Sequence, residues 1–463
     1  MNDVTSETKL ADAKLARWIE ENIGGTVTRL ERQPRWRPSW FADVEKDGKL
    51  LPLYIRGQRI DFLPPCPVDE EAKILQILEA HDIPVPHVYG MCKDPHAIIM
   101  ANVPGKGTLS KAANEAERVS VLEHLAELMV KVRAIDPKEF EAAGLKVPTS
   151  REESALCVFK PCEEIYRRVK VRPEPPIEFV IAWLKRNAPK RASKPALQQA
   201  DSGQFLFENG KVTALHDYEY ACLGDPYLDL AALRFRAIYA SMGDLRPLFH
   251  RYAELRDEPL DRFDFCYQAI EWHVTNAMQG VVPVATQPVD GNYPEIMSWY
   301  VCGMHCVYQA MAEAIGVKLE IPPPMTPQPS RWGSVHAIIE QRAPAWDKRL
   351  TPEGLDGTEE DYKKLVDHDL AVYARRLDVY RDELEAEYLA EAADILGRPV
   401  QGWVETDRQL EAFVMTCGPE YDKRLFRMFF RWNYRLMELV RGLGADNRMM
   451  YEWFQPLDEL GIK

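Results

Sequence analysis

The chain has 463 residues, of which 46% are hydrophobic and 28% are charged, and its formal net charge is −14. This composition is typical of a globular protein, the length predicts two or three domains, and the acidity argues against a nucleic-acid partner, which requires basic surface. No apolar run approaches the roughly 20 residues of a membrane helix, and the polar stretch 1–7 lacks the apolar core of a signal peptide, so we expect a cytoplasmic protein with no membrane contact.

The first hundred residues have the pattern of a helix followed by a small antiparallel sheet. Apolar residues recur at helical spacing over residues 10–23, and Gly24-Gly25 ends this helix. Asp47-Gly48 is a strong signal for a short hairpin between two of the strands. A second helix is expected at residues 68–81. The predicted strands are residues 26–30, 40–44, 50–56, 87–90 and 97–103.

The stretch 198–230 carries most of the functional signal, and predicted helices at residues 115–135, 154–170 and 177–186 precede it. Asp201 lies in a polar loop after an apolar run, and Asp217 stands directly beyond the second strand of a hairpin that turns at Glu208-Asn209-Gly210. Two carboxylates at adjacent strand ends can share one small site. Phosphoryl transfer uses such a pair, one to orient the attacking hydroxyl and one to hold magnesium.

This stretch resembles the aminoglycoside phosphotransferase-like (APH/choline kinase-type) small-molecule kinases, which are relatives of protein kinases. Their pattern runs His-Gly-Asp, a short loop to an Asn, a hairpin, then Asp-x-Glu and Gly-Asp-Pro-x-x-Asp-Leu. On this resemblance Asp201 is the catalytic base and Asp217 the magnesium-binding aspartate. Glu219, Asp225 and Asp229 match the acidic positions that follow.

The chain departs from the family pattern at two positions. Gln199 stands where the family usually has His, and the segment up to Asp217 is two residues shorter than usual, which brings Gln204 to the position of the metal-binding Asn. Glutamine offers the same amide oxygen on a longer arm. The resemblance therefore implies that Gln204 and Asp217 hold Mg²⁺, with Gln199, Glu219 and Asp225 as possible support.

The resemblance also implies a nucleotide site in the first hundred residues. Arg56 occupies the place of the cation on the third strand, and Glu71 matches the glutamate that pairs with this cation and holds it over the phosphates. Backbone groups of Met100 and Asn102 would meet the adenine of ATP, and GTP is not excluded. The alternative interpretation is a strand-end surface arginine and a solvated acidic face.

The loop at residues 33–40 contains no glycine, so its backbone amides cannot easily wrap phosphate groups. Arg35 and Arg37 are candidate side-chain donors in their place. A stiff loop without a ligand is the alternative.

The expected fold is α+β, a protein-kinase-like bilobal arrangement with an added helical module. We expect a small antiparallel-sheet lobe at residues 1–103, a mainly helical lobe with the catalytic and acceptor site at 104–320, a proline-rich linker at 321–334 and a C-terminal helical module at 335–463. Helices after Asp217 line the acceptor pocket in this family, although aromatic residues at helical spacing are more often core. The candidate lining residues are Trp272, His273, Trp299, Tyr300 and His305.

The C-terminal module lies beyond the resemblance. An apolar stripe over residues 362–395 predicts one long helix that Gly397 ends, and helices are also expected at 405–417 and 420–441. These helices could pack on the kinase-like part, form a homodimer or bind another partner.

Two functions remain open from the sequence. The first is an ATP- and Mg²⁺-dependent phosphotransferase that moves the γ-phosphoryl group to a hydroxyl of a small molecule. The second is a catalytically impaired, kinase-like scaffold whose helical C-terminal module binds a partner; the departures at Gln199, the shortened loop and the glycine-free loop favour it, whereas the retention of Asp201 and Asp217 counts against it.

Overall fold

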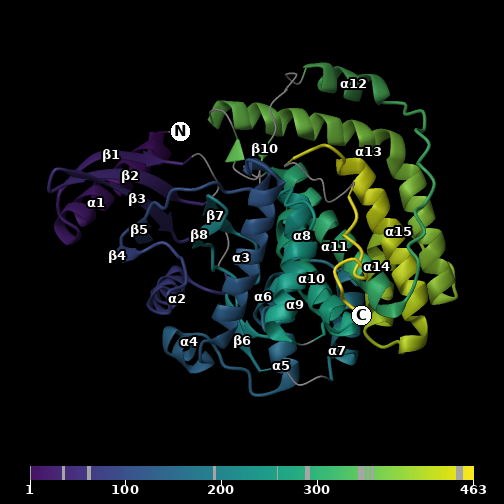
Figure 1. The fold of residues 1–463 in the computed structure, drawn as a ribbon. Coiled ribbons are helices and arrows are strands. Elements are labelled where there is room, and N and C mark those ends of the chain that lie inside the picture. The colour runs from purple at the N-terminus through teal and green to yellow at the C-terminus, as the bar shows by residue number, and fades with distance from the viewer. Residues whose placement is uncertain are drawn as a thin grey trace.

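The computed structural model describes residues 2–33, 37–59, 64–190, 194–257, 259–286, 292–342, 350–351, 354–355, 359–444 and 452–463. These residues form a small sheet-containing lobe beside a larger helical lobe, and the C-terminal helices cover the far side of the larger lobe (Figure 1). The predicted α+β, two-lobed fold with extra C-terminal helices is confirmed. Among the described residues, no helix is long and apolar enough to cross a membrane.

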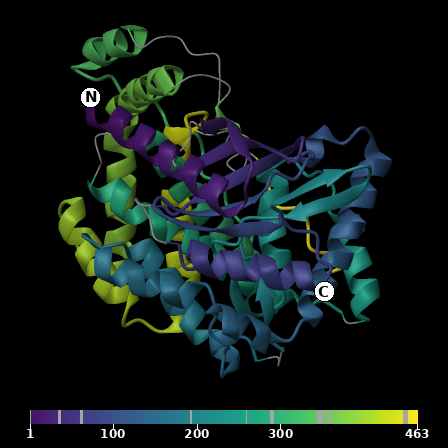
Figure 2. The same cartoon turned by 90° about the vertical axis from the view of Figure 1, so that its left-hand side faces the viewer.

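The small lobe contains a five-stranded antiparallel sheet in the order β1-β2-β3-β5-β4. Asp47 and Gly48 join β2 to β3 with φ angles of 53° and 69°, the left-handed pair that a two-residue type I′ hairpin requires. Helices α1 and α2 lie on either side of the sheet (Figure 2), so β5 buries Ile99 in the cluster with α1 and Ile98 in the cluster with α2. The elements are α1 (Asn2–Asn22), β1 (Thr26–Arg32), β2 (Ser39–Lys46), β3 (Lys49–Gly57), α2 (Val68–Ala80), β4 (Val88–Lys93) and β5 (His96–Ala101).

The large lobe is built around the helix pair α10 and α11; α6, α7 and α8 pack against α10, and α3 packs against α9. Two short strand pairs, β6–β9 and β7–β8, lie where this lobe faces the sheet (Figure 1). Its elements are η1 (Leu109–Lys111), α3 (Glu115–Ala134), α4 (Pro137–Ala143), α5 (Arg151–Ala155), α6 (Phe159–Val169), α7 (Pro175–Arg186), β6 (Ala196–Gln198), β7 (Phe205–Glu208), β8 (Lys211–Leu215), β9 (Cys222–Gly224), α8 (Tyr227–Tyr239), α9 (Arg246–Arg256), α10 (Arg262–Thr286) and α11 (Tyr293–Ile315).

The single helix predicted at residues 154–170 is wrong, because a turn at 156–158 separates α5 from α6. The buried carboxylate of Glu271 on α10 accepts a hydrogen bond from the Phe159 backbone N–H at 2.8 Å. A new helix can therefore begin there, with one of its unpaired N–H groups satisfied. Burial raises the pKa of Glu271 to about 8.

The C-terminal helices form a layer that shares one hydrophobic core with the large lobe. The long predicted helix is confirmed as α13, which has 38 residues. On α15, Phe426 and Phe430 pack edge-on against Tyr308 of α11, with ring centroids 5.9 and 6.2 Å away. The elements are α12 (Gly333–Arg342), β10 (Leu350–Thr351), β11 (Gly354–Leu355), α13 (Glu359–Leu396), α14 (Trp403–Val414), η2 (Pro419–Tyr421) and α15 (Asp422–Val440).

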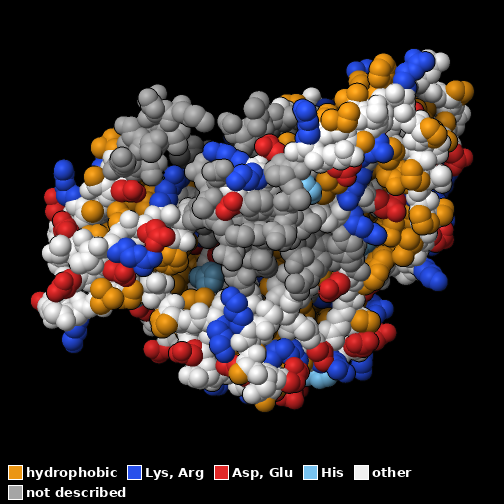
Figure 3. All heavy atoms as spheres, turned by 90° about the horizontal axis from the view of Figure 1, so that it is seen from above, with side chains coloured by type: hydrophobic (Ala, Val, Ile, Leu, Met, Phe, Trp, Pro, Cys, Tyr) orange, Lys and Arg blue, Asp and Glu red, His pale blue; other side chains and the backbone are white. Residues whose placement is uncertain are grey.

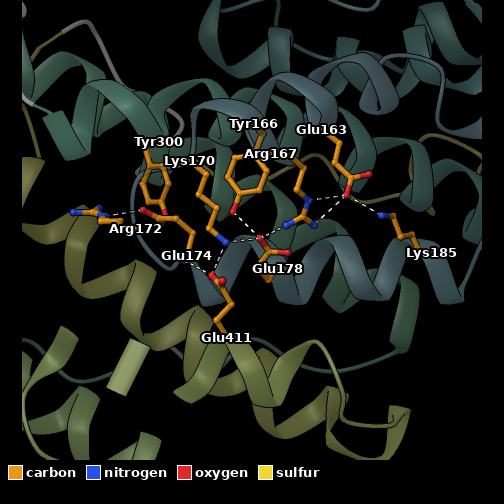
Figure 4. A network of polar contacts seen from close by, with 10 residues as sticks. All are labelled: Glu163, Tyr166, Arg167, Lys170, Arg172, Glu174, Glu178, Lys185, Tyr300 and Glu411. Carbon is orange, nitrogen blue, oxygen red and sulfur yellow. Dashed lines mark hydrogen bonds and ion pairs between the residues drawn. The ribbon is translucent and has the colours of Figure 1, made fainter. Parts of the chain in front are cut away.

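A buried polar network fastens α14 to the connection between α6 and α7 (Figure 4). Glu178 Oε1 accepts hydrogen bonds from the Tyr166 hydroxyl at 2.9 Å, from Arg167 at 2.5 Å and from Lys170 Nζ at 2.7 Å. Lys170 also donates to Glu411 of α14 at 2.6 Å. Burial opposes ionisation of Glu178, but the two cations outweigh it and lower the pKa of this carboxyl. The tail is thus attached through paired charges as well as through apolar packing.

Residues 452–463 return to the large lobe. Phe454 stacks on His273 of α10 with ring centroids 5.8 Å apart, Arg234 Nε donates to the Gln455 carbonyl at 2.9 Å, and the Arg262 N–H donates to the Lys463 carbonyl at 2.9 Å. This segment is therefore part of the lobe's packing.

The face seen from above carries hydrophobic side chains on its right, over the C-terminal helices (Figure 3). On and beside α12, Trp332, Val335, Ile338 and Ile339 are each about half exposed or more.

Candidate functional site

The site is built from two chain segments that the antiparallel strands β7 and β8 bring together. Residues 199–204, here called the Asp201 loop, lead from β6 into β7, and Asp217 follows β8 by two residues. Phe205 at the start of β7 is paired with Leu215 at the end of β8, so Asp201 and Asp217 lie at the same end of this ladder. Ala200 and Asp217 both have left-handed φ angles, of 63° and 67°. The predicted hairpin turn at residues 208–210 is confirmed.

The Asp201 loop is held from behind by the side chain of Asp229 on α8. Its two carboxylate oxygens accept the backbone N–H groups of Gln199 at 3.1 Å and of Ala200 at 2.8 Å. Burial raises the pKa of Asp229 to about 6, although these two hydrogen bonds act in the opposite direction. Asp229 therefore fixes a backbone turn that Ala200 adopts only under constraint.

Gln199 bridges the two segments of the site. Its Nε2 donates to the His216 carbonyl at 2.5 Å and contacts the Gln204 carbonyl at 3.3 Å. At the position where the family pattern has histidine, the glutamine amide thus provides a side-chain donor to the residue before Asp217. Gln199 thus connects the Asp201 loop to the Asp217 segment.

Asp201 has a polar partner on each carboxylate oxygen. Gln204 Nε2 donates to Oδ2 at 2.7 Å, and Arg236 of α8 forms an ion pair with Oδ1. Burial raises the pKa of Asp201 above its ordinary value, while the Arg236 charge opposes this effect. The Asp201 side chain retains 22% exposure, so solvent reaches it.

Arg56 connects the sheet to the Asp217 segment. Its Nε donates to Glu71 Oε2 at 3.0 Å, and its guanidinium forms an ion pair with Asp217. The other oxygen of Glu71 accepts the Tyr218 backbone N–H at 3.0 Å. The predicted contact between Arg56 and Glu71 is thus present, and both side chains are buried.

A second arginine reaches the site from the glycine-free loop. Arg37 is almost fully buried and forms an ion pair with Glu219. Arg35, the other candidate from this loop, lies outside the described residues. Glu219 also lies 4.0 Å from the Arg56 guanidinium, so the two arginines and the Asp217–Glu219 segment form one charged cluster.

The residues predicted to contact adenine lie at the end of β5. Met100 is flanked by Tyr54 of β3 and Val88 of β4 in the sheet, and the Asn102 backbone N–H donates to the Pro52 carbonyl at 3.0 Å. This N–H is therefore engaged within the small lobe. The nucleotide roles of Met100 and Asn102 remain predictions.

Asp225 makes a structural contact at the start of α8. Its Oδ1 accepts the Tyr227 backbone N–H at 3.0 Å at the start of α8. The preceding residue, Gly224, is packed so closely that an added Cβ would lie 2.1 Å from the Cys157 Sγ atom. Asp225 and Gly224 thus set the position of α8, which carries Asp229 and Arg236.

The ligands predicted for Mg²⁺ are the Asp217 carboxylate and the Gln204 amide oxygen. Both are hard oxygen donors of the kind that Mg²⁺ prefers, and Gln204 uses its nitrogen for the contact with Asp201. Within the described ranges, no group of three or more His, Cys, Asp or Glu side chains forms a preformed metal site. The residues therefore fit an ion that arrives with phosphate oxygens and water.

The acceptor candidates from the sequence are mostly core. Trp272, His273, Tyr300 and His305 are buried, whereas Trp299 is half-buried and packs on Tyr239 with ring centroids 5.1 Å apart. A cavity of about 30 Å³ lies behind the Asp201 loop, against α3, which is room for a water molecule or two and far too little for a nucleotide.

Arg236 is the main residue that sequence reasoning missed. It lies seven residues after Asp229, and two turns of helix place both side chains on the same face of α8. The sequence shows this spacing. It does not show that this face of α8 contacts the Asp201 loop, because the contact joins residues 35 positions apart in the chain.

Comparisons with known proteins agree with this geometry. Residues 59–264 match the sequence model of the phosphotransferase enzyme family, APH. A crystal structure of a candidate aminoglycoside phosphotransferase from Ralstonia eutropha JMP134 is similar with a TM-score of 0.51 at 14% identity, over 66% of this chain and 98% of that one. A mutant of aminoglycoside phosphotransferase APH(4)-Ia in complex with ADP and hygromycin B gives a TM-score of 0.49 at 16% identity, over 66% of this chain and all of that one.

Among curated proteins, mouse acyl-CoA dehydrogenase family member 10 is 22% identical over 175 residues. The match covers 35% of this chain but only 16% of the mouse protein, so the two chains share a region and not a whole architecture.

Proposed function

We propose that this protein is a kinase that transfers the γ-phosphoryl group of ATP to a hydroxyl of a small molecule, since residues 59–264 match the phosphotransferase enzyme family model and the fold is similar to that of an aminoglycoside phosphotransferase candidate. The observation that carries this proposal is the convergence of Asp201, Gln204 and Asp217 on one side with the Arg56–Glu71 pair on the other. A carboxylate for the hydroxyl, oxygen donors for a metal and a cation for phosphate are the parts that phosphoryl transfer uses.

Asp201 is proposed to accept a hydrogen bond from the acceptor hydroxyl and to take its proton as the new bond forms. Its main contribution is positioning, because the loose transition state of phosphoryl transfer asks little of a strong base. Arg56, kept in place by Glu71, would hold phosphate oxygens with its planar fork. Gln204 and Asp217 would hold Mg²⁺, which supplies neutralisation of the charge on the phosphate oxygens when it is bound.

Binding would require an exchange of ion pairs. Arg56 contacts Asp217, and Arg236 contacts Asp201, so both carboxylates that the reaction needs are held by guanidinium groups. Nucleotide phosphates offer Arg56 an alternative partner, and this releases Asp217 toward the metal. We expect nucleotide binding without magnesium to be much weaker for this reason.

A scaffold without catalysis is the second candidate. The engaged Asn102 N–H and the glycine-free loop favour it, because both reduce the backbone donors available to a nucleotide. The charged cluster around Arg56 counts against it, since buried ion pairs contribute little net stability compared with apolar packing.

A thermal-shift titration with Mg-ATP and Mg-GTP separates the two functions. Nucleotide at 100 times its dissociation constant adds about 2.7 kcal/mol to the stability of the protein that binds it. We expect a magnesium-dependent shift in the natural protein, its loss in Asp217→Ala, and its retention in Asp201→Asn together with loss of turnover. If no nucleotide shifts the natural protein, the kinase proposal fails and the scaffold function takes its place.

A further inference from the structure

Arg236 is placed where an acceptor molecule would have to sit. Its guanidinium contacts the carboxylate of Asp201, and its side chain is 12% exposed beside the 22% exposed Asp201 side chain. The Tyr239 ring lies 5.4 Å from its Cζ, and Trp299 packs on the other part of that tyrosine. A cation with neighbouring aromatic surface thus borders the reacting carboxylate.

The aliphatic part of the Arg236 side chain is tightly packed, whereas its guanidinium has a donor without an acceptor. A Cβ added at Gly203 would lie 2.8 Å from the Arg236 Cγ, so the Asp201 loop packs directly on this side chain. The Arg236 Nε is buried and has no hydrogen-bond acceptor among the described residues. Leaving such a buried donor unpaired costs free energy, so an acceptor group that reaches the Arg236 guanidinium would be stabilised there.

Each carboxylate nearest the reacting centre is paired with an arginine. Glu219 pairs with Arg37, Asp217 pairs with Arg56, which also holds Glu71, and Asp201 pairs with Arg236. A polycationic acceptor would therefore meet the Arg236 guanidinium at the reacting oxygen. An acceptor with its own negative group would instead draw Arg236 away from Asp201 and leave that carboxylate able to accept the hydroxyl proton.

We propose that the acceptor carries an oxyanion, a carboxylate or a phosphate, close to its reacting hydroxyl, and that Arg236 binds this group. This inference rests on the proposed kinase function. In the reaction the acceptor O–H bond breaks and its oxygen bonds to the γ-phosphorus of ATP. The bond from that phosphorus to the β,γ-bridging oxygen breaks, ADP leaves, and the proton passes to Asp201. Arg236 takes no part in these bonds and acts by binding and orienting the acceptor.

The first test measures oxyanion binding and does not need the natural acceptor. The protein saturated with Mg-ADP is titrated with glycerate, with inorganic phosphate and with glycerol, and binding is followed by thermal shift. We expect at least one of the two anions, and not glycerol, to bind, and Arg236→Gln to weaken this binding about 10- to 100-fold, as loss of a charge-assisted forked contact does. Arg246→Gln, a surface arginine paired with Asp244, is the matched control and should bind the anions normally.

The second test compares acceptors by ADP release. The panel contains glycerate and 3-hydroxybutyrate as carboxylates, glycerol 3-phosphate as the phosphate, glycerol and 1,3-butanediol as neutral counterparts, and kanamycin as the polycation. We expect kcat/KM to favour an anion over its neutral counterpart, with Arg236→Lys and Arg236→Gln raising the KM of the anion more than they lower kcat. The preferred anion tells a carboxylate from a phosphate acceptor.

Two outcomes would overturn the inference while the kinase proposal stands. One is that kanamycin or a neutral alcohol is phosphorylated in an Asp201-dependent reaction, with a kcat/KM that no anion reaches. The other is Mg-ADP binding that is lost in Asp217→Ala, together with anion binding that is absent or equal in Arg236→Gln and the natural protein. A variant that lowers kcat equally for every acceptor would reduce Arg236 to a residue that only positions Asp201.

Discussion

Glu71 helps to join the small lobe to the Asp217 segment through both oxygens of its carboxylate. One of its oxygens accepts from Arg56 Nε and the other from the Tyr218 N–H, both at 3.0 Å. In Glu71→Gln one of these donors must face the amide nitrogen, so a charge-assisted bond is lost and a buried donor is left unpaired. Such a change costs about 3 kcal/mol and lowers the melting temperature by about 3 °C. Mg-ATP affinity should fall about tenfold, because Arg56 is no longer held in place.

Glu79→Gln is the matched control for this measurement. Glu79 lies at the other end of α2, is 43% exposed and pairs with the exposed His87, so the same substitution there should change the stability by less than about 0.5 kcal/mol. Differential scanning calorimetry measures both variants, with and without Mg-ATP. If Glu71→Gln melts within 1 °C of the natural protein, about the shift expected of the control, the proposed link between α2 and the Asp217 segment is refuted.

Three further substitutions test the supports of the site. The pKa of Asp229 is raised from 3.8 to about 6, so the folded state binds this proton more tightly than the unfolded state does. The free energy of unfolding should therefore fall by up to about 3 kcal/mol as the pH rises from 4 to 6. In Asp229→Asn, urea unfolding measured over this pH range should show a flatter dependence. Gly224→Ala places a Cβ 2.1 Å from Cys157 Sγ and should lower the melting temperature sharply, with partial recovery in the double variant that also carries Cys157→Ala. Glu411→Gln weakens the contact with Lys170 and should cost about 1–2 kcal/mol, and an unchanged melting temperature would show that the polar network does not hold α14.

The parts of the fold that sequence could predict are local. Asp47-Gly48 and Asn209-Gly210 both form the hairpins expected of them, because the left-handed turn is a property of the two residues themselves. The apolar stripe over residues 362–395, which lies on α13, could also be predicted because its periodicity is a local property of the sequence. Arg56 and Glu71 are only 15 residues apart, and the order of strand and helix was enough to bring them together.

The parts that could not be predicted depend on contacts between distant segments. Arg236 became a site residue only because α8 packs on the Asp201 loop. Asp229 and Arg37 were candidates from the sequence, but their partners could not be predicted, because Asp229 accepts the Gln199 N–H 30 positions earlier and Arg37 pairs with Glu219, 182 positions later. The break between α5 and α6 has the same origin, since Glu271 accepts the Phe159 N–H from more than a hundred residues away in the chain. Charge partners at such separations leave no periodic signal in the sequence.

Residues 452–463 have a consequence for how this protein is made. A ribosome adds roughly 5–20 residues per second, and a domain whose contacts are all upstream can fold while the chain is still growing. Here the His273 ring, the Arg234 guanidinium and the start of α10 receive Phe454, Gln455 and Lys463. The large lobe therefore completes its packing against residues 452–463 only after residue 463 has emerged, so these contacts are among the last to form during synthesis.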